Sequence, residues 1–421
     1  MSQVTLAGTP YSMRDALMSN TYWNIETKRQ SASNLSTGNA VGATNKDFRV
    51  MGVAEAPWDA VRIHILNAET SNSVQGFTAN FAPTSTLTGF PTPTGTWTTF
   101  TWSAAGSVNL VDSSSNQLFT VVTSDWMSSA NIQSVARTDG GVYPAFMITQ
   151  HNPTGAGAFT YTFEGQSSTT FDTDDLTRGR RWFKAFQSNI DGVSTPANFT
   201  QTAESNNINP MIVQFRSRGR VLSYMASGDS IQGGSLTTSN MLSPGFRMAI
   251  SNSNNGTLPI QYFGSGWASQ TSANYLANAK TLITATQPQV CSYAVYSPND
   301  SAPSAAQNQI WMRQAMDFVQ HCRSNNCIPV LLGPTPINTD SASAVGFKVA
   351  LNNSLLALRL RGIFVVDYWA RVATTTPTGT AIWTPGYTDD ASFIHPNDTS
   401  AAVMARALWE DAIQYIVAAN S

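Results

Sequence analysis

Charged residues are scarce in this 421-residue chain, at 11% of the sequence against about 25% in an average globular protein. The net charge of −2 offers no basic surface for nucleic acid or an anionic membrane, so neither is expected as a partner. No apolar run approaches the roughly 20 residues of a membrane-spanning helix. Because the first ten residues lack both a basic start and a continuous apolar run, we expect no secretory signal peptide.

Cysteine and histidine are also rare, with three and four residues. Three cysteines cannot form the disulfide framework of a small secreted domain. Cys322 and Cys327 could form a single bridge under oxidising conditions, whereas Cys291 lies in an apolar segment and is expected to be an inert core thiol. No cluster of Cys and His indicates a metal site, so we expect no metal and no organic cofactor.

Ser, Thr, Asn and Gln supply the polar surface that charged residues usually provide. Such a composition is typical of exported or particle-borne proteins. It favours an extracellular or virion-associated location, with the cytoplasm as the alternative. A homo-oligomer or a virion assembly would fit this composition, although nothing in the sequence demonstrates either.

The pattern of the chain changes twice, which divides it into three parts. Residues 1–45 are polar and weakly patterned, and we expect an extended or partner-bound arm. Residues 46–217 contain short alternating segments separated by Gly, Pro, Asn and Ser, as in Ala60–Leu66, Thr96–Trp102 and Tyr143–Thr149. Regular short strands with such punctuation predict an all-β sandwich, which could bind carbohydrate.

Residues 218–421 alternate between apolar strands and amphipathic helices. Strands are predicted at 221–226, 258–263, 290–296, 328–332 and 363–366, and helices at 243–252, 268–286, 303–324, 341–360 and 399–418. This alternation predicts a parallel sheet with helices on both faces, an α/β class fold with three flavodoxin-like layers.

Three chemically useful side chains follow strands of this predicted sheet. Ser230 comes after the first strand, Asn299 after the third and His395 in the loop after the fifth. Ligands of such sheets bind beyond the carboxyl ends of the strands. We therefore expect the three side chains to meet at one edge of the sheet, although Ser230 and His395 are far apart in sequence.

A strand that ends in the tight turn Gly228-Asp229-Ser230 is a suitable place to expose a nucleophilic hydroxyl. Of the four histidines, His395 is the favoured general base. The other three have other expected roles: His64 alternates with the apolar residues of a strand, His321 lies near a helix end, and His151 is expected in a turn. The pair of Ser230 and His395 indicates a serine hydrolase.

With these motifs the chain resembles the SGNH (GDSL-type) hydrolase family over about residues 219–421. The resemblance lies in Gly228-Asp229-Ser230, Gly264-Ser265-Gly266, Ser297-Pro298-Asn299-Asp300 and His395-Pro396. It implies that Ser230 attacks an ester carbonyl while His395 accepts its proton. It also implies an oxyanion hole made by the N–H groups of Ser230 and Gly266 and the side chain of Asn299. From the residues alone, Asn299 could instead cap a following helix.

The sequence departs from the family pattern at two positions. Ser297 stands where the family has a glycine, and Ser392 stands where it has the aspartate of the triad. The nearest carboxylates, Asp389 and Asp390, are six and five residues before His395. Two alternatives stay open: Asp390, ahead of Asp389, completes the triad through a bulged loop, or the site is a Ser–His dyad oriented by a backbone carbonyl.

Members of this family hydrolyse lipid esters, thioesters and acetyl esters of sugars. A sandwich ahead of the catalytic domain resembles carbohydrate acetylesterases and phage tail deacetylases, and no long apolar lid segment follows Ser230. We therefore expect removal of O-acetyl groups from a polysaccharide. Trp267 and Trp383 could stack on a sugar ring or belong to the core. The alternatives are a lipase or thioesterase, and a non-hydrolytic glycan-binding or virion structural protein.

Overall fold

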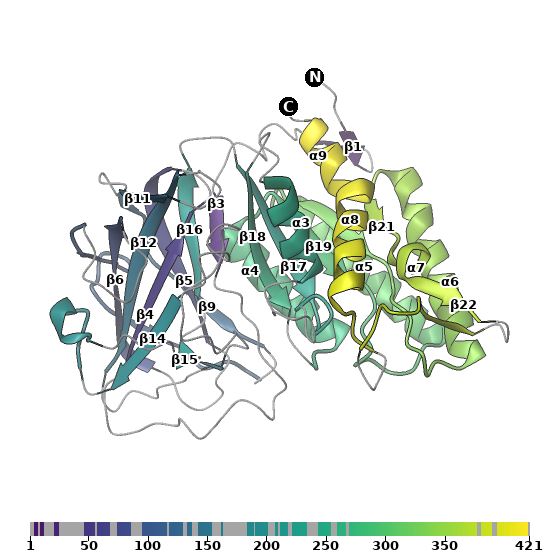
Figure 1. Ribbon diagram of the computed structural model, residues 1–421, viewed down its shortest axis with the longest axis horizontal. Coiled ribbons are helices and arrows are strands. Elements are labelled where there is room, and N and C mark those ends of the chain that lie inside the picture. The colour runs from purple at the N-terminus through teal and green to yellow at the C-terminus, as the bar shows by residue number, and fades with distance from the viewer. Residues whose placement is uncertain are drawn as a thin grey trace. The chain divides into compact units, whose positions relative to one another are not determined.

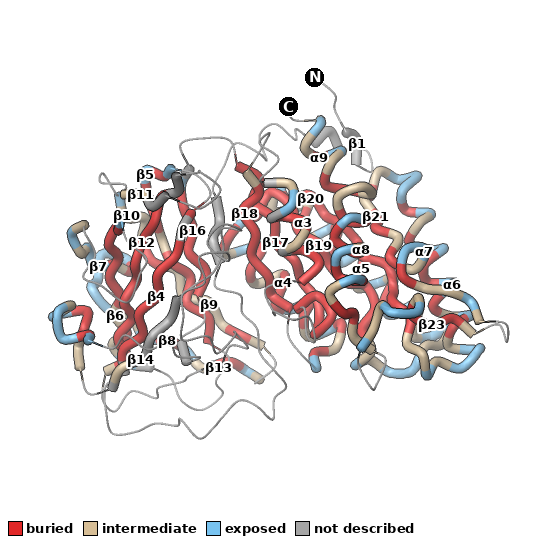
Figure 2. Tube along the Cα trace, in the orientation of Figure 1, coloured by how far each residue is buried: buried red, intermediate tan, exposed pale blue. Residues whose placement is uncertain are grey.

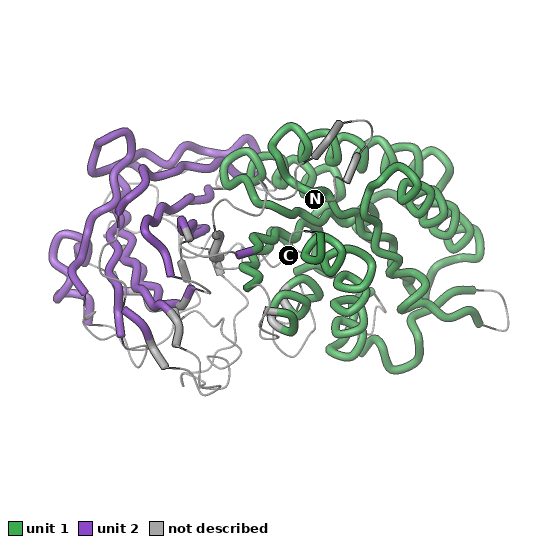
Figure 3. Tube along the Cα trace, turned by 90° about the horizontal axis from the view of Figure 1, so that it is seen from above, with its two compact units in different colours: residues 1–19, 222–421 green, residues 20–221 purple. Residues whose placement is uncertain are grey.

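Two compact units make up the chain in this computed structural model (Figure 3). Unit 2 comprises residues 20–221, and unit 1 comprises residues 222–421 together with residues 1–19. The sequence analysis had placed the border between residues 217 and 218. The structure describes residues 4–6, 9–11, 21–24, 46–54, 57–67, 74–85, 95–115, 118–128, 133–136, 142–153, 161–162, 183–188, 190–200, 207–208, 211–217, 221–233, 243–253, 259–266, 269–376, 380–389 and 394–419.

A five-stranded parallel sheet forms the centre of unit 1 (Figure 1). Its strands, in spatial order, are β18 (Ile260–Gly266), β17 (Leu222–Gly228), β19 (Val290–Ala294), β20 (Ile328–Leu332) and β21 (Phe364–Val366). In sequence order this arrangement is 2-1-3-4-5, as in flavodoxin-like doubly wound sheets. Every residue of β17 to β20 is buried (Figure 2), because helices cover both faces.

Two groups of helices cover this sheet. The helices are α3 (Pro244–Ser253), α4 (Ser272–Thr286), α5 (Ala305–Ser324), α6 (Ala342–Ala357) and α8 (Asp398–Leu408). One group contains α3 and α8, which pack against each other, and the other contains α4, α5 and α6 in succession. The predicted parallel sheet with helices on both faces is therefore confirmed. The predicted bounds differ by a few residues, except at the end of α8.

Side-chain caps fix where four of these helices begin. An Asn, Ser or Thr side chain accepts hydrogen bonds from backbone N–H groups of the first turn, which have no partner inside the helix. The capping residues are Thr271 for α4, Ser304 for α5, Ser341 for α6 and Asn397 for α8.

Some elements of unit 1 were not anticipated. The predicted helix 341–360 ends as the 3₁₀ turn η5 (Leu358–Arg361), and the predicted helix 399–418 contains the π-helical turn η6 (Trp409–Ile413) before α9 (Gln414–Ala418). Three short elements follow β21: the helix α7 (Tyr368–Val372) and the antiparallel pair of β22 (Ala373–Thr375) and β23 (Ala381–Trp383). Strands β1 (Val4–Leu6) and β2 (Thr9–Tyr11) pair with each other.

Unit 2 contains two larger antiparallel sheets. The first consists of β10 (Met127–Ser128), β5 (Trp58–Asn67), β16 (Met211–Ser217) and β3 (Thr21–Asn24), with β9 (Thr120–Thr123) also paired to β5. The second consists of β14 (Phe183–Ser188), β4 (Lys46–Val53), β12 (Val142–Asn152), β6 (Val74–Thr84) and β7 (Thr98–Thr99), with β11 (Gln133–Ala136) and β8 (Val108–Leu110) at its edges. A separate short pair is β13 (Tyr161–Thr162) with β15 (Asn207–Ile208).

Aromatic side chains join these two sheets. Trp58 of the first sheet is fully buried and makes edge-on contacts with Phe81 and Phe146 of the second, with ring centroids 6.0 and 6.2 Å apart. Such edge-to-face pairs are a favoured aromatic geometry. Strand β3 of the first sheet comes from the segment expected to be an arm, and the predicted strand Thr96–Trp102 is reduced to the two residues of β7.

No helix among the described residues is long and apolar enough to cross a membrane. Cys291, Cys322 and Cys327 are all buried free thiols, and burial raises the pKa of Cys291 and Cys322. The thiols of Cys322 and Cys327 are therefore not bridged in this structure, and the question of their oxidation stays open.

Candidate active site

Ser230 lies in the turn directly after β17, at the carboxyl edge of the sheet. The turn is closed by the N–H of Gly233, which donates to the carbonyl of Asp229 at 2.9 Å. Gly228 has to be a glycine, because a Cβ there would lie 2.8 Å from Cβ of Gln232, inside van der Waals contact. The hydrogen bonds within the turn use the N–H groups of Ile231 and Gly233 and not that of Ser230.

His395 lies shortly before α8 and contacts Ser230. Its Nε2 lies 2.9 Å from Ser230 Oγ, although the two residues are 165 positions apart in sequence. Asn397 holds this part of the chain in place, since it caps α8 and its Nδ2 also donates to the carbonyl of Gly386 at 2.8 Å. The structure therefore brings the two residues together at hydrogen-bond distance, as a nucleophile and its general base require.

Asp229 is a buried carboxylate beside this pair. Its Oδ1 accepts a hydrogen bond from the N–H of Ile231 at 2.9 Å, and its Oδ2 accepts one from Ser297 Oγ at 2.6 Å. Burial raises the pKa of Asp229 to about 6, while the Ser297 hydrogen bond and the charge of His395 lower it. A carboxylate with such a pKa is ionised at neutral pH.

Gly266 is the last residue of β18 and pairs with Gly228 across the sheet. Its backbone lies directly against the turn that follows Ser230, since a Cβ on Gly266 would lie 2.7 Å from Cα of Gly233. Only glycine allows this approach. Gly264, two residues earlier, has Tyr262 rather than the turn as its neighbour. The position of Gly266 fits a donor in the oxyanion hole, and its role stays a prediction.

Asn299 is exposed and lies five residues after β19. It does not cap the following helix, because Ser304 does so. Its Nδ2 donates to the carbonyl of Gln270 at 3.1 Å and to Ser297 Oγ at 3.3 Å. The second of these bonds is long and can be given up to an oxyanion with little loss. The oxyanion role of Asn299 stays a prediction.

Two carboxylates, those of Asp389 and Asp390, precede His395 in sequence. Asp390 lies outside the described residues. The carboxylate of Asp389 is exposed and accepts a hydrogen bond from Asn397 Nδ2 at 3.1 Å, so this side chain supports the loop before α8. A triad with Asp390 and a dyad both stay open.

Sequence reasoning missed one residue of the site and left two alternatives open for another. Ser297 was noted only as a replacement for glycine, yet its hydroxyl contacts Asp229, Gln270 and Asn299. Trp383 is 1% exposed and belongs to the apolar core of unit 1, so it cannot stack on a substrate. Trp267, the other aromatic considered for stacking, lies outside the described residues.

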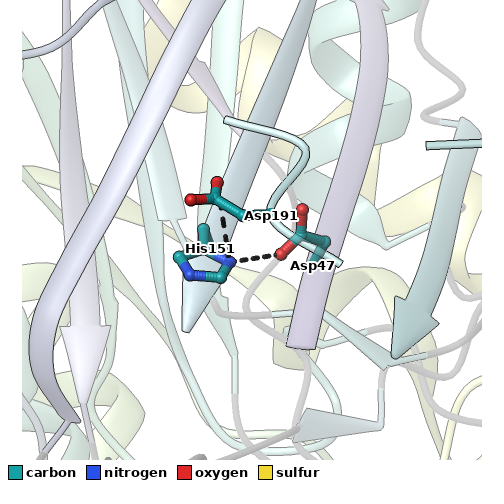
Figure 4. A group of neighbouring side chains, drawn as sticks. All are labelled: Asp47, His151 and Asp191. Atoms are coloured by element: carbon teal, nitrogen blue, oxygen red, sulfur yellow. Dashed lines mark hydrogen bonds and ion pairs between the residues drawn. The ribbon is translucent and has the colours of Figure 1, made fainter. Parts of the chain in front are cut away.

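A second group of polar side chains lies in unit 2 and was not predicted (Figure 4). His151 was expected in a turn but lies in β12, opposite Asp47 of β4, with Asp191 above them. His151 Nδ1 is 2.6 Å from Asp47 Oδ1 and 4.0 Å from Asp191 Oδ1. Burial lowers the pKa of His151, but its hydrogen bond and ion pair with Asp47 outweigh that effect and raise it overall.

The ligand atoms of this group are close enough for a metal ion, all within 4.8 Å of one another. Each of them already has a hydrogen-bond partner. Asp47 accepts from the N–H of Gly192, and Asp191 Oδ1 accepts from the N–H groups of Val193 at 3.1 Å and Ser194 at 2.8 Å. A metal would have to displace the proton between His151 and Asp47. The group is better described as a buried ion pair that fastens the segment 190–194 to the second sheet.

No protein-family model and no curated protein matches the sequence. Solved structures similar to the chain include a GDSL-like lipase from Bacteroides thetaiotaomicron, at 18% identity and a TM-score of 0.36, covering 47% of this chain and 88% of that one. A lipase from a goat rumen metagenome (14% identity, TM-score 0.37) covers 46% of this chain and 98% of its own. A psychrotrophic esterase from a Pseudoalteromonas species (10% identity, TM-score 0.36) gives the same two coverages. At such low TM-scores the function has to be inferred from the site itself.

Proposed function

We propose that the protein is a serine esterase of the SGNH type that removes acyl groups, most of all O-acetyl groups, from a polysaccharide. The distance of 2.9 Å between His395 Nε2 and Ser230 Oγ carries this proposal. A serine hydroxyl within reach of a histidine, at the carboxyl edge of a parallel sheet, is the arrangement needed for acyl transfer.

The reaction follows from the positions of these groups. Ser230 Oγ attacks the ester carbonyl as its proton passes to His395 Nε2, which gives a tetrahedral oxyanion and an imidazolium. The imidazolium then donates its proton to the leaving alcohol, and an acyl-serine remains. Water attacks this ester as one of its protons passes to His395. The imidazolium then returns that proton to Ser230 Oγ as the bond between Oγ and the acyl carbon breaks, which releases the acid and free Ser230. The ionised Asp229 stabilises the imidazolium in both halves through its charge.

The oxyanion is assigned to three donors: the N–H groups of Ser230 and Gly266 and the side-chain amide of Asn299. The close packing of Gly266 on the turn of Ser230 and the long bond from Asn299 to Ser297 support this assignment. Each such donor typically contributes about 3 kcal/mol to stabilising the transition state.

The choice of a polysaccharide ester rests on unit 2 and on composition. A large all-β unit, interpreted as a sandwich that binds glycan, belongs to the same chain, and the sequence holds few charged residues. An uncharged acetylated polysaccharide would suit this composition. This part of the proposal is independent of the esterase chemistry.

A fluorophosphonate probe and an acetate assay test the two parts separately. The probe should label the wild-type protein and leave Ser230→Ala unlabelled, and absence of labelling would refute the esterase. Acetylated xylan and acetylated capsule or O-antigen should release acetate faster than long-chain esters are cleaved. Fast cleavage of long-chain esters or thioesters with no acetate from any glycan would refute the substrate class.

A further inference from the structure

Ser297 has a buried hydroxyl that connects Asp229 with Asn299 beside the proposed active site. It lies three residues after β19 and is 1% exposed. Its Oγ has four polar neighbours: Asp229 Oδ2 at 2.6 Å, the Gln270 carbonyl at 3.0 Å, the Asn299 N–H at 3.2 Å and Asn299 Nδ2 at 3.3 Å. It therefore touches both the carboxylate next to the nucleophile and the proposed oxyanion donor.

A hydroxyl has one proton to donate and two lone pairs to accept with. When Asp229 is ionised, the short distance of 2.6 Å places the Ser297 proton on its carboxylate, since charge-assisted bonds are the shorter ones. Both lone pairs of Ser297 are then available to the two N–H donors of Asn299. In this state the Gln270 carbonyl receives no proton from Ser297 and accepts a hydrogen bond from Asn299 Nδ2 instead, at 3.1 Å.

Protonation of Asp229 reverses the direction of this bond. The acid now donates to Ser297 Oγ, and the Ser297 proton turns to the Gln270 carbonyl. One lone pair is used by Asp229, so only one remains for the two donors of Asn299. The protonation state of the carboxylate is in this way transmitted to the amide on the other side of the hydroxyl.

We propose that Ser297 is a positioning residue of the esterase. Its hydroxyl donates to the Asp229 carboxylate and accepts from the Asn299 backbone N–H, which holds Asn299 where its side-chain amide can turn to the oxyanion. This inference rests on the proposed function and adds a residue that acts through two others. In the absence of the Ser297 hydroxyl, Asp229 loses the shorter of its two hydrogen bonds, and Asn299 loses the group that links it to the carboxylate.

Other groups around Asp229 shift its pKa, some of them upward and some downward. The charge of His395 favours the carboxylate, as does the N–H of Ile231, and the charge of Asp300 opposes it. Two buried phenols also interact electrostatically with Asp229, those of Tyr275 and Tyr296. Burial is the largest influence and raises the pKa of Asp229 to about 6, so loss of the Ser297 bond is expected to raise it further.

The dependence of kcat/KM on pH tests the proposal, with p-nitrophenyl acetate as the substrate. In Ser297→Ala the acid limb should move to higher pH by about one unit, and kcat at neutral pH should fall about 10-fold while KM stays within about twofold. Ser297→Thr keeps the hydroxyl and should restore the wild-type limb. If Ser297→Ala does not fold, Ser297→Cys, a weak donor of similar size, should move the limb in the same direction.

Ser292→Ala is the matched control. It removes a buried hydroxyl of the same segment, one that lies 2.6 Å from Tyr224 Oη and away from Asp229, so the acid limb should stay in place. Asp229→Asn removes the carboxylate through which Ser297 is proposed to act. In the Asp229→Asn background, the change Ser297→Ala should no longer move the limb.

The outcomes distinguish this inference from the proposed function. An active esterase whose acid limb is the same in Ser297→Ala and wild type, or moves equally in Ser292→Ala, overturns the role of Ser297 alone. Absence of ester hydrolysis together with absence of fluorophosphonate labelling overturns the proposed function and the inference with it.

Discussion

Each unit of the chain holds a histidine in a short hydrogen bond to an oxygen atom, and the two pairs differ in what they can do. In unit 1, His395 Nε2 lies 2.9 Å from the hydroxyl of Ser230, and the His395 ring is half-buried. In unit 2, His151 Nδ1 lies 2.6 Å from the carboxylate of Asp47, and both side chains are buried.

The difference lies in the partner of each histidine and in its remaining hydrogen bonds. A hydroxyl that passes its proton to histidine becomes a nucleophile, whereas a carboxylate already lacks that proton and only holds the ring. Asp47 is also held by the N–H of Gly192, so it cannot turn to another ligand without losing that bond. A short histidine contact alone therefore does not identify an active site. The partner must be able to change its bonding during a reaction.

The strongest test of this comparison removes one residue from each pair. Ser230→Ala should lower kcat for p-nitrophenyl acetate by about 10⁴-fold or more, because no nucleophile remains. Stability should change little, since a small side chain is replaced by one that is smaller by a single oxygen atom. His151→Ala, measured in parallel, should keep kcat within about twofold of wild type. Equal losses of activity in the two variants would contradict the distinction.

The second test concerns stability, for which His151 should matter more than His395. His151→Ala leaves the carboxylate of Asp47 buried without its charged partner and should destabilise the protein by about 3 kcal/mol. The contribution of His151 is complete below pH 6.5, provided that Asp47 is ionised, and is lost as pH rises through the raised pKa of folded His151. Burial raises the pKa of Asp47, so acidification that protonates this carboxylate also removes the ion pair. Urea unfolding of both proteins across this range measures the effect. His395→Ala is the matched control and should cost much less stability.

How far the sequence predicts these two regions depends on whether a pattern extends over many residues. The meeting of Ser230 and His395 was predictable, because parallel strands place their carboxyl ends at one edge whatever lies between them. The conformation of the segment around His395 was less predictable. A five-residue offset between Asp390 and His395 does not determine a loop conformation, and Asp390 lies outside the described residues.

Contacts made by single side chains were beyond sequence reasoning. Asp47 and His151 lie about a hundred residues apart, and only the pairing of β4 with β12 makes them neighbours. Ser297 carried a signal in the form of a serine at the position of a family glycine, but its four contacts depend on three loops. The sequence left Trp383 open between a stacking position and the core, and the structure places it in the core, at the end of the short hairpin of β22 and β23.

A smaller effect is expected at Asp229, where one substitution should raise stability and lower activity. Its pKa is raised by burial from 3.8 to about 6, so folding favours the protonated acid. The wild type should therefore lose stability as pH rises from about 4 to 6, by about 2 kcal/mol in total. Asp229→Asn should abolish this loss and be more stable at pH 7.5, yet slower as an esterase. Unfolding curves at pH 4 and 7.5 give the answer, and a variant less stable at pH 7.5 than wild type would contradict it.

The smallest expected effect is that of metal ions on unit 2. A site with a Kd of about 1 μM would stabilise the protein by about 2.7 kcal/mol at 100 μM Zn²⁺, which a thermal scan detects easily. Because the hydrogen bonds of Asp47 and Asp191 already use the candidate ligand atoms, we expect no shift with Zn²⁺ or Ca²⁺ at this concentration. A shift present in wild type and absent in both His151→Ala and Asp47→Asn would overturn this interpretation. It would also show that the buried pair in unit 2 can change its bonding, as the pair in unit 1 must.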